Sequence, residues 1–178
     1  MKIVSSLTDP AIDQPCVLSI GNFDGLHLGH RAILKTVTDR ARQLGIQSAV
    51  LTFEPHPIAF LAPDKAPRRI STPRQKEQLI REAGIDVLFV AKFNAEFASL
   101  SPEDFIRNYI MDGLHARVVC VGSNFNFGRN QSGTIHTLRQ WPTRFEIVET
   151  AAVMIRRTVA SSTLIRKYVA AGRMTATR

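Results

Sequence analysis

The chain has few of the features that mark secreted, membrane-spanning or fibrous proteins. Only two of its 178 residues are cysteine. Each cysteine lies in an apolar run, which favours buried free thiols over a disulfide or a thiolate metal site. The longest purely apolar run is a handful of residues, whereas a membrane-spanning helix needs about 18. Since the N-terminus also lacks a signal-peptide pattern, we expect a soluble, cytoplasmic protein with no membrane partner and one ordinary-sized core.

Repeats, low-complexity stretches and lysine-rich tails are also lacking. The net charge of +8 favours a polyanionic partner, either a nucleic acid or a small phosphorylated ligand. Because no dedicated basic arm is present, we expect small phosphorylated molecules and no nucleic acid. Any single basic pair taken alone is best explained as solvated surface. The basic groups are Arg68/Arg69, Arg74/Lys76, Arg156/Arg157, Arg166/Lys167 and Arg173/Arg178.

Five apolar, β-branched runs alternate with amphipathic stretches along the chain. This alternation predicts an α/β fold, a Rossmann-like doubly wound sheet of five parallel strands with helices on both faces. The predicted strands cover residues 17–20, 48–53, 87–91, 117–121 and 145–148. The predicted helices cover residues 28–44, 73–83, 102–114, 133–141 and 161–171.

The segments that follow the predicted strands are unusually polar, glycine-rich or histidine-bearing. They are GNFDGLHLGH at residues 21–30, EPHP at 54–57 and GSNFNFGRNQSG at 122–133. Open parallel sheets bind ligands beyond the carboxyl ends of their strands, so these segments mark the expected binding edge. The stretch 54–71 contains four prolines and exceeds ordinary loop length, which predicts a functional flap or a mobile segment.

The segment GNFDGLHLGH matches neither the dinucleotide fingerprint nor the Walker A loop, and GRNQSGT at 128–134 lacks the Walker lysine. It predicts a tight Asp24-Gly25 turn leading into a helix whose first turn carries His27 and His30. Residues three apart share a helix face, so both imidazoles project from one side of a helix N-terminus. Free N–H groups and the helix dipole at that position favour a polyphosphate.

Plainer interpretations of the same residues stay open. Asp24-Gly25 can be simply a turn, and His27 can cap the helix or lie inert on the surface. Asp24, His27 and His30 can also be combined into a metal site, although no cysteine or HExxH partner accompanies them. Two histidines with glycines at the expected binding edge favour phosphate binding, and no residue is predicted to be a metal ligand.

GNFDGLHLGH resembles the HxGH signature of the nucleotidyltransferase superfamily, which includes the catalytic domains of class I aminoacyl-tRNA synthetases. Five further blocks follow in order: TFEPHP, PDKAPRRIST, FNAEFASLSPEDFI, VGSNFNFGRNQSG and SSTLIR. Together the blocks span nearly the whole chain and resemble the FMN adenylyltransferase module of bacterial FAD synthetases. The resemblance implies transfer of AMP from ATP to FMN, giving FAD and pyrophosphate with Mg2+.

The resemblance also assigns catalytic roles. His27 and His30 would contact the ATP phosphates, with His30 steadying the transition state, and the SSTLIR segment would close on them from the opposite side. Serine and threonine hydroxyls at a helix start, with an arginine one turn on, suit phosphate binding, although plain capping with Ser161 as the cap explains the same pattern. The implied catalytic residues are His27, His30, Thr163 and Arg166.

Further positions are implied to bind substrate. Asn124 would contact the FMN phosphate or ribityl chain, and Phe127 would pack near the flavin or simply in the core. His56, between two prolines, is expected in an extended loop, near the substrate or in a structural role. Asp24 would shape the turn or assist metal and water, and glycines at 122–128 would let adenine or ribose approach the backbone. The full set is Gly21, Phe23, Asp24, Gly25, His56, Gly122, Asn124, Phe127, Gly128 and Ser162.

Two departures from the family pattern qualify these expectations. Many relatives carry a basic residue two positions before the paired serines, where this chain has Val159 and places Arg157 two further back. One substrate-phosphate contact is therefore expected to be missing or shifted. We also expect a single nucleotidyltransferase domain over residues 1–178, without the riboflavin kinase domain of bifunctional relatives. A transferase for a different phosphorylated acceptor and a non-catalytic flavin- or nucleotide-binding paralogue remain the alternatives.

Overall fold

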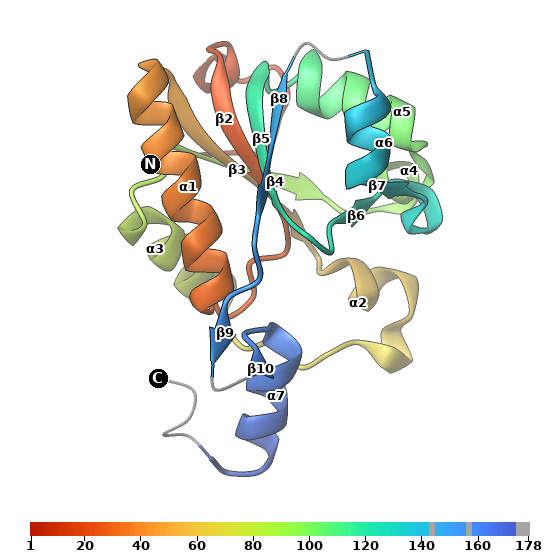
Figure 1. The fold of residues 1–178 in the computed structure, drawn as a ribbon. Coiled ribbons are helices and arrows are strands. Elements are labelled where there is room, and N and C mark those ends of the chain that lie inside the picture. Colours follow the sequence, from red (N-terminus) through yellow and green to blue (C-terminus); the bar gives the residue numbers. More distant parts are fainter. Residues whose placement is uncertain (143–144, 156–157, 174–178) are drawn as a thin grey trace.

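The computed structural model describes residues 1–142, 145–155 and 158–173. Its centre is a sheet of parallel strands in the order β1-β4-β3-β2-β5-β8 (Figure 1). The strands are β1 (Lys2–Val4), β2 (Cys16–Ile20), β3 (Gln47–Glu54), β4 (Val87–Lys92), β5 (Ala116–Gly122) and β8 (Glu146–Thr150). The predicted α/β fold with a parallel sheet is confirmed.

The sheet has six strands rather than the five predicted, and β1 is the additional one. It is three residues long and pairs with β4 at one edge of the sheet, with Lys2 opposite Val87. Only Val4 of the three residues is buried. Because the strand is short and mostly exposed, its sequence lacks the apolar run by which the other five were found. Those five overlap their predicted ranges almost completely.

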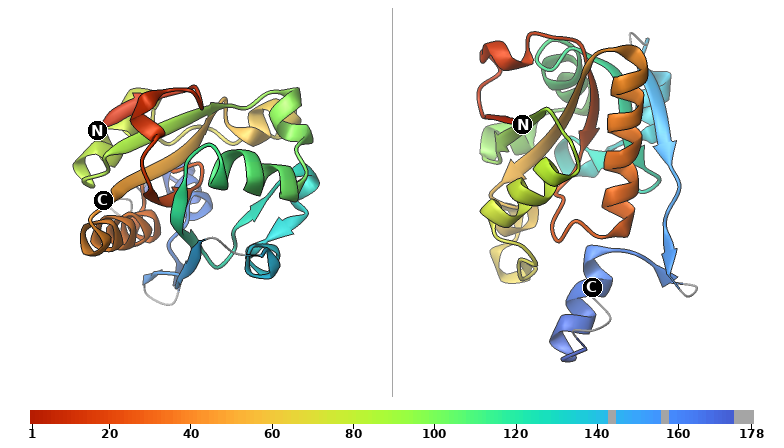
Figure 2. Two further views of the ribbon diagram at one scale, coloured as in Figure 1. Left: turned by 90° about the horizontal axis from the view of Figure 1, so that it is seen from above. Right: turned by 90° about the vertical axis from the view of Figure 1, so that its left-hand side faces the viewer.

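Helices cover both faces of the sheet, as predicted (Figures 1 and 2). One face carries α1 (Leu28–Leu44) and α3 (Pro73–Glu82); the other carries α4 (Ala95–Ser99), α5 (Pro102–Phe105), the π-helical turn η3 (Ile106–Met111) and α6 (Ile135–Gln140). Each layer has its own hydrophobic core. The helical residues that fill the two cores include Leu34, Val37 and Ile80 on the first face and Phe105, Ile110 and Leu138 on the second.

The helix predictions differ from the structure mainly at their ends. The helix expected over 102–114 is α-helical only through Phe105 and continues as a π-helical turn. The helix expected over 133–141 begins at Ile135, because Gly133–Thr134 (β7) pairs with Asn126–Phe127 (β6). In contrast, α1 has the predicted bounds, since Gly45 ends it with a φ of 64°.

The topology places the loop after β2 at the centre of the binding edge. The chain runs from β2 outward through β3 to β4, and then crosses to β5 and β8 on the other side of β2. Strand order therefore reverses next to β2, which is the position where such sheets bind ligands.

Two segments lie beyond the carboxyl ends of the strands. The stretch predicted as a flap is structured and contains α2 (Pro57–Leu61) and the 3-10 turn η2 (Pro63–Lys65). After β8 the chain passes through the antiparallel pair β9 (Met154–Ile155) and β10 (Thr158–Val159) to α7 (Ser162–Ala170). Figures 1 and 2 show α7 below the sheet, past the strand ends.

Both cysteines are free and buried, as predicted. Burial raises the pKa of each thiol to about 12, so both are protonated hydrophobic groups at neutral pH. Within the ranges that the structure describes, no helix has both the length and the apolar character that a membrane crossing requires.

Gly128 shows how tightly the β5–β6 region packs. Its φ of 71° and ψ of 179° lie in a region that is essentially restricted to glycine. A Cβ at this position would lie 2.9 Å from the backbone nitrogen of Pro102. The glycine is therefore required by packing against the start of α5.

Replacing Gly128 by alanine should destabilise the fold more than the same change at Gly45. Gly45 also has a positive φ, but a Cβ there would meet nothing within 4 Å. We expect Gly45→Ala to cost about 1 kcal/mol and Gly128→Ala about 3 kcal/mol or more of unfolding free energy, measured by urea denaturation. Equal losses in the two variants would contradict this account of Gly128.

Candidate functional site

The loop after β2 adopts a backbone conformation that its sequence does not favour by itself. Phe23, Gly25 and Leu26 have φ values of 49°, 78° and 34°, and non-glycine residues rarely adopt positive φ. Phe23 and Leu26 are 1% and 3% exposed and belong to the core beneath α1. A Cβ on Gly25 would lie 2.7 Å from Cγ2 of Ile70. The loop is therefore held by core burial and by close packing against the end of the 54–71 segment.

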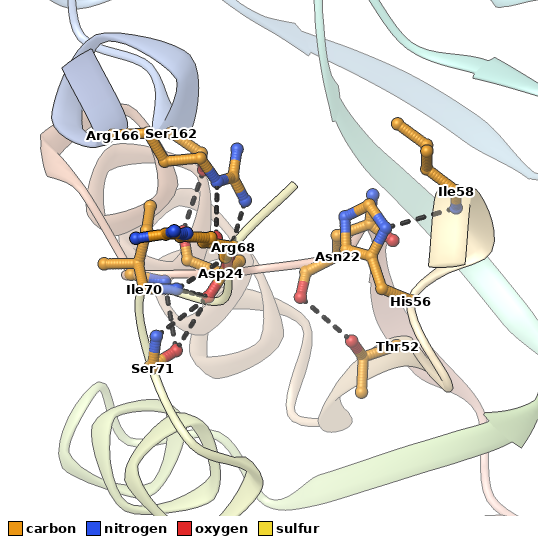
Figure 3. Close-up of polar contacts among 11 residues, drawn as sticks. Asn22, Asp24, Thr52, His56, Ile58, Arg68, Ile70, Ser71, Ser162 and Arg166 are labelled. Carbon is orange, nitrogen blue, oxygen red and sulfur yellow. Dashed lines mark hydrogen bonds and ion pairs between the residues drawn. The ribbon is translucent and has the colours of Figure 1, made fainter. Parts of the chain in front are cut away.

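The carboxylate of Asp24 joins this loop to two other segments (Figure 3). It accepts the backbone N–H groups of Ile70 at 3.1 Å and Ser71 at 3.0 Å, and the Ser71 hydroxyl at 3.1 Å. Nη2 of Arg166 on α7 donates to the same carboxylate at 2.6 Å. The Asp24 side chain is only 10% exposed. A single carboxylate thus connects the loop after β2, the end of the flap and the C-terminal helix.

Further hydrogen bonds reinforce these connections. The Ser162 hydroxyl donates to the backbone carbonyl of Asp24 at 2.8 Å, and the N–H of Gly25 donates to Oγ of Ser71 at 3.1 Å. Nε of Arg166 donates to the carbonyl of Arg68 at 2.8 Å. Ser161, rather than Ser162, caps α7 by accepting the N–H of Leu164. The expectation that Ser161 is the cap is therefore confirmed.

Asp24 is ionised at neutral pH. Burial alone would raise the pKa of its carboxyl, but the hydrogen bonds from Ser71, Ile70 and Arg166 outweigh burial and hold the pKa below its ordinary value. Among the described residues, no three His, Cys, Asp or Glu side chains gather to hold a metal ion.

His27 and His30 lie together at the start of α1, on one side of the helix. Their rings stack with centroids 3.7 Å apart, and Nδ1 of His27 accepts the N–H of His30 at 3.3 Å. His27 is therefore the helix cap, one of the plainer interpretations of the sequence. A Cβ on Gly29 would lie 3.1 Å from the His27 ring and 3.4 Å from the carbonyl oxygen of Ala160. The chain just before α7 thus passes close to this helix start.

His30 is a neutral imidazole. Burial, and to a smaller extent the neighbouring His27, lower its pKa to about 3, against a partial opposing effect of the Asp24 charge. Burial also lowers the pKa of His27. Nδ1 of His30 is buried and has no hydrogen-bond partner within the part of the chain that the structure describes. The helix start therefore presents uncharged imidazoles together with backbone N–H groups.

His56 lies at the flap side of the same site. Its Nδ1 accepts the N–H of Ile58 at 3.2 Å, so His56 caps α2 (Figure 3). Burial lowers its pKa, and the charge of Arg166 lowers it further against the opposing effect of Asp24. The structural role that the sequence allowed for His56 is thus present, and the residue also lines a cavity beside Asp24.

Other predicted site residues are exposed or have packing roles. Thr163 and Asn124 are exposed. Phe127 is 6% exposed and packs against Phe105 and Phe125, which is the core role that the sequence also allowed. A Cβ on Gly21 would lie 3.3 Å from the ring of Phe23. Contacts of these residues with substrate stay predictions.

The departure from the family pattern lies on the short strand before α7. Val159 belongs to β10 and is 45% exposed. Arg157, the residue named as a shifted basic group, lies outside the described residues.

Another predicted contact, Gly122, ends β5, and a Cβ there would lie 3.5 Å from Oδ1 of Asn124.

Several residues of this site were not singled out in the sequence. Ile70 and Ser71 bind Asp24 through backbone N–H groups, which carry no side-chain signal. Lys76 counted only as part of a basic pair, although its Nζ donates to Oγ1 of the buried Thr52 at 3.2 Å. Asn22 was simply part of the glycine-rich segment. The segment PDKAPRRIST contains Ile70 and Ser71, and its resemblance to the family pattern is the one sequence signal that points to them.

Comparison with known proteins identifies the family. The profile of the family described as FAD synthetase matches residues 9–164. The chain belongs to the FAD synthetase family. It is 33% identical over 174 residues to a bifunctional riboflavin kinase/FMN adenylyltransferase of Escherichia coli strain K12, covering 96% of this chain and 56% of that protein.

A second relative of the same name, from Bacillus subtilis strain 168, is 42% identical over 123 residues, covering 68% of this chain and 39% of the relative. The chain thus spans about half the length of the curated FAD synthetase relatives that it matches over nearly its whole sequence.

Solved structures share the fold. A structure titled as a macrolide-efflux protein from Streptococcus pneumoniae has a TM-score of 0.88 and 25% identity, covering 98% of this chain and 59% of that one. Pantothenate synthetase from Thermus thermophilus has a TM-score of 0.61 and 17% identity, covering 99% and 71%. At 17% identity, the likeness to pantothenate synthetase shows a shared fold and nothing more.

Replacing Asp24 by asparagine should destabilise this FAD synthetase-family fold in a pH-dependent way. The folded-state pKa of Asp24 is lowered, so its carboxylate contributes stability above the ordinary pKa of 3.8, and this contribution is lost as pH falls through the folded-state value. We expect Asp24→Asn to cost about 2 kcal/mol near neutral pH, with the difference from wild type shrinking as pH falls to about 3. Urea denaturation at both pH values measures the difference.

Asp64→Asn is the matched control, because Asp64 lies in η2 of the same flap and is exposed. It should leave the unfolding free energy close to wild type. A destabilisation of Asp24→Asn that stayed constant across the pH range would contradict the assignment to the Asp24 charge.

Proposed function

We propose that this chain transfers AMP from ATP to FMN, giving FAD and pyrophosphate. The observation that carries the proposal is the meeting of two phosphate-binding elements at the loop after β2. One element is the start of α1 with His27 and His30. The other is α7, joined to the loop through Arg166 and Ser162. Membership of the FAD synthetase family supplies the substrate pair.

In the proposed reaction, an oxygen of the FMN phosphate attacks the α-phosphorus of ATP. The new phosphorus–oxygen bond forms as the bond to the bridging oxygen of the β-phosphate breaks, and pyrophosphate leaves with that electron pair. No nucleophile from the protein is needed. Catalysis then consists of positioning the two phosphates and stabilising the charge that develops on the oxygens of the transition state.

The described side chains suit that task. The N-terminus of α1 offers backbone N–H groups and the positive end of a helix dipole to the triphosphate. Because His30 is neutral, it acts on the phosphate oxygens by hydrogen bonding rather than by charge. Charge neutralisation falls to Arg166, whose guanidinium carries five N–H donors. Two of them are engaged with Asp24 and the Arg68 carbonyl, and the others face the substrate in this proposal.

Mg2+ belongs to the proposed reaction as the companion of ATP, and it would help to neutralise the phosphate charge. The two carboxylates of the site are both committed, Asp24 to Arg166 and Glu54 to Arg69. The described residues therefore do not form a cage for the metal, and Mg2+ would be carried on the nucleotide phosphates, as is common for this ion.

Incubating the protein with ATP, FMN and Mg2+ and separating the products by chromatography tests the proposal. We expect FAD and pyrophosphate to form in equal amounts. Pyrophosphate release with another phosphorylated acceptor but not with FMN would contradict the substrate assignment. Flavin binding without product would instead indicate a non-catalytic member of the family.

Replacing His30 by alanine should lower kcat by tens to thousands of fold if His30 stabilises the transition state, since one preorganised donor contributes about 3 kcal/mol. His136→Ala is the control, because His136 is an exposed residue of α6, and it should leave kcat unchanged. Since His30 is partly buried, the unfolding free energy of each variant is measured alongside. A folded His30→Ala variant with wild-type turnover would remove His30 from the mechanism.

A further inference from the structure

The imidazole of His30 lacks the kind of hydrogen bond that commonly orients a functional histidine. In many such histidines, one ring nitrogen donates to a carboxylate or to a backbone carbonyl, and this bond fixes the ring. Nδ1 of His30 is buried, yet it has no hydrogen-bond partner in the described ranges of the chain. The orientation of the ring must therefore come from packing.

Two aromatic rings pack against His30. The ring of His27 stacks on it, with centroids 3.7 Å apart and an angle of 22° between the planes. The ring of Phe23 is tilted against it, with centroids 5.1 Å apart and an angle of 55°. The separation of Phe23 and His30 is within the range of attractive aromatic pairs. His30 is thus the ring that contacts both of the others.

Phe23 is the more firmly fixed of the two neighbours. Its side chain is 1% exposed and belongs to the core beneath α1, so its ring has almost no surface to offer a substrate. Core side chains are closely packed and occupy well-defined rotamers. The ring of Phe23 therefore gives the imidazole of His30 an immobile surface to pack against.

Glycines make room for both flanking rings. A Cβ on Gly21 would lie 3.3 Å from Cε2 of Phe23, and a Cβ on Gly29 would lie 3.1 Å from Nδ1 of His27. Both distances are shorter than ordinary van der Waals contact. The absence of side chains at these two positions lets each ring lie directly against the backbone, which leaves the rings little room to move.

The backbone of Phe23 is a separate observation that supports a functional role for its ring. The φ of Phe23 is 49°, a value that bulky residues rarely adopt. Backbone strain of this kind is concentrated at functional sites, where the direction of a side chain matters. In this loop, the strained residue is the one whose ring reaches His30.

We propose that Phe23 is a positioning residue for His30, and that its ring, together with that of His27, holds the imidazole in the orientation that serves the phosphate. The inference rests on the proposed function, in which His30 acts on the transition state by hydrogen bonding. Phe23 itself contacts no substrate and acts only through His30. Because hydrogen bonds weaken steeply with misalignment, a loosely held imidazole should lower kcat more than it raises the KM for ATP.

Phe23→Leu tests the proposal, because leucine keeps an apolar side chain in the core and removes the ring. We expect kcat to fall about 10- to 100-fold, the range for a small misplacement of a catalytic group, with the KM for ATP close to wild type. In a His30→Ala background, the same change should lower kcat no further, since a positioning residue has no effect once the group that it positions is gone.

Phe89→Leu is the matched control. Phe89 is 2% exposed and belongs to the core on the other face of the sheet, where its ring contacts Tyr109. This variant should lose a comparable amount of unfolding free energy and keep the kcat of wild type. Urea denaturation shows whether each variant is folded. Phe23→Met replaces the leucine variant if that one does not fold, because methionine adapts to irregular spaces in a core.

The mobility of the His30 ring gives a second readout that does not depend on turnover. Carbon-13 relaxation of the Cε1–H bond of His30 measures its order parameter in the protein without ligand. We expect a value close to that of rigid backbone, about 0.85, in wild type and Phe89→Leu, and a fall toward the flexible range, below about 0.6, in the Phe23 variant.

A folded Phe23 variant with wild-type kcat would overturn the proposal. So would a loss of kcat that persists undiminished in the His30→Ala background, because Phe23 would then act by another route. If wild type forms no FAD, the proposed function fails, and the order parameter decides the role of Phe23. A His30 ring that stays ordered without Phe23 then overturns that role, whereas a ring that becomes mobile supports it.

Discussion

The site depends on one buried carboxylate. Asp24 sits in the loop after the central strand and receives donors from two segments that are distant in sequence, the flap at Ile70 and Ser71 and α7 at Arg166. A buried carboxylate must be paired, because an unpaired charge with little access to water is costly. Satisfying Asp24 therefore brings together the segments that the proposed chemistry needs. Without it, neither the flap nor α7 has a charged contact with the loop after β2 among those described.

This arrangement separates two tasks. Burial of Phe23 and Leu26 in the core holds the strained loop after β2 in place. Asp24 then fixes the flap and α7 to that loop. In the proposed function, phosphate binding falls to the N–H groups at the start of α1, to the neutral imidazole of His30 and to the donors of Arg166 that Asp24 and the Arg68 carbonyl leave unused. In the cavity beside Asp24, the buried Thr52 positions the ammonium of Lys76.

The sequence predicts those parts of the structure that follow from local pattern. The bounds of α1 follow from its apolar periodicity and from Gly45, and the five long strands follow from their buried runs. Strand β1 was missed because its three residues show no run, and it exists only through pairing with β4. The position of the loop after β2 at the carboxyl ends of the strands was also predictable, since it depends on the alternation of elements rather than on their exact ends.

The site was predictable only in part, because several of its contacts depend on tertiary structure rather than on local sequence pattern. His27, His30 and Arg166 belong to recognisable motifs, and Asp24 was found as a turn residue. Its role as the anchor of two remote segments was not visible, because its partners Ile70 and Ser71 contribute backbone groups. Lys76 lies on α3 and reaches the cavity through tertiary structure alone. Phe127 and Gly128 were predicted to contact substrate, with a core role also open for Phe127. They pack against Phe105 and Pro102, respectively, and their contact with substrate stays a prediction.

The central claim is that Asp24 and Arg166 act as one unit that joins the loop after β2 to α7. A double-mutant cycle with Asp24→Asn, Arg166→Gln and the combined variant tests it most directly, with the unfolding free energy and the affinity for ATP as readouts. The account predicts a coupling of about 1 kcal/mol or more in the unfolding free energy, and ATP binding that is weakened by either change alone. Additive effects on unfolding, with ATP affinity unchanged in both single variants, would contradict it.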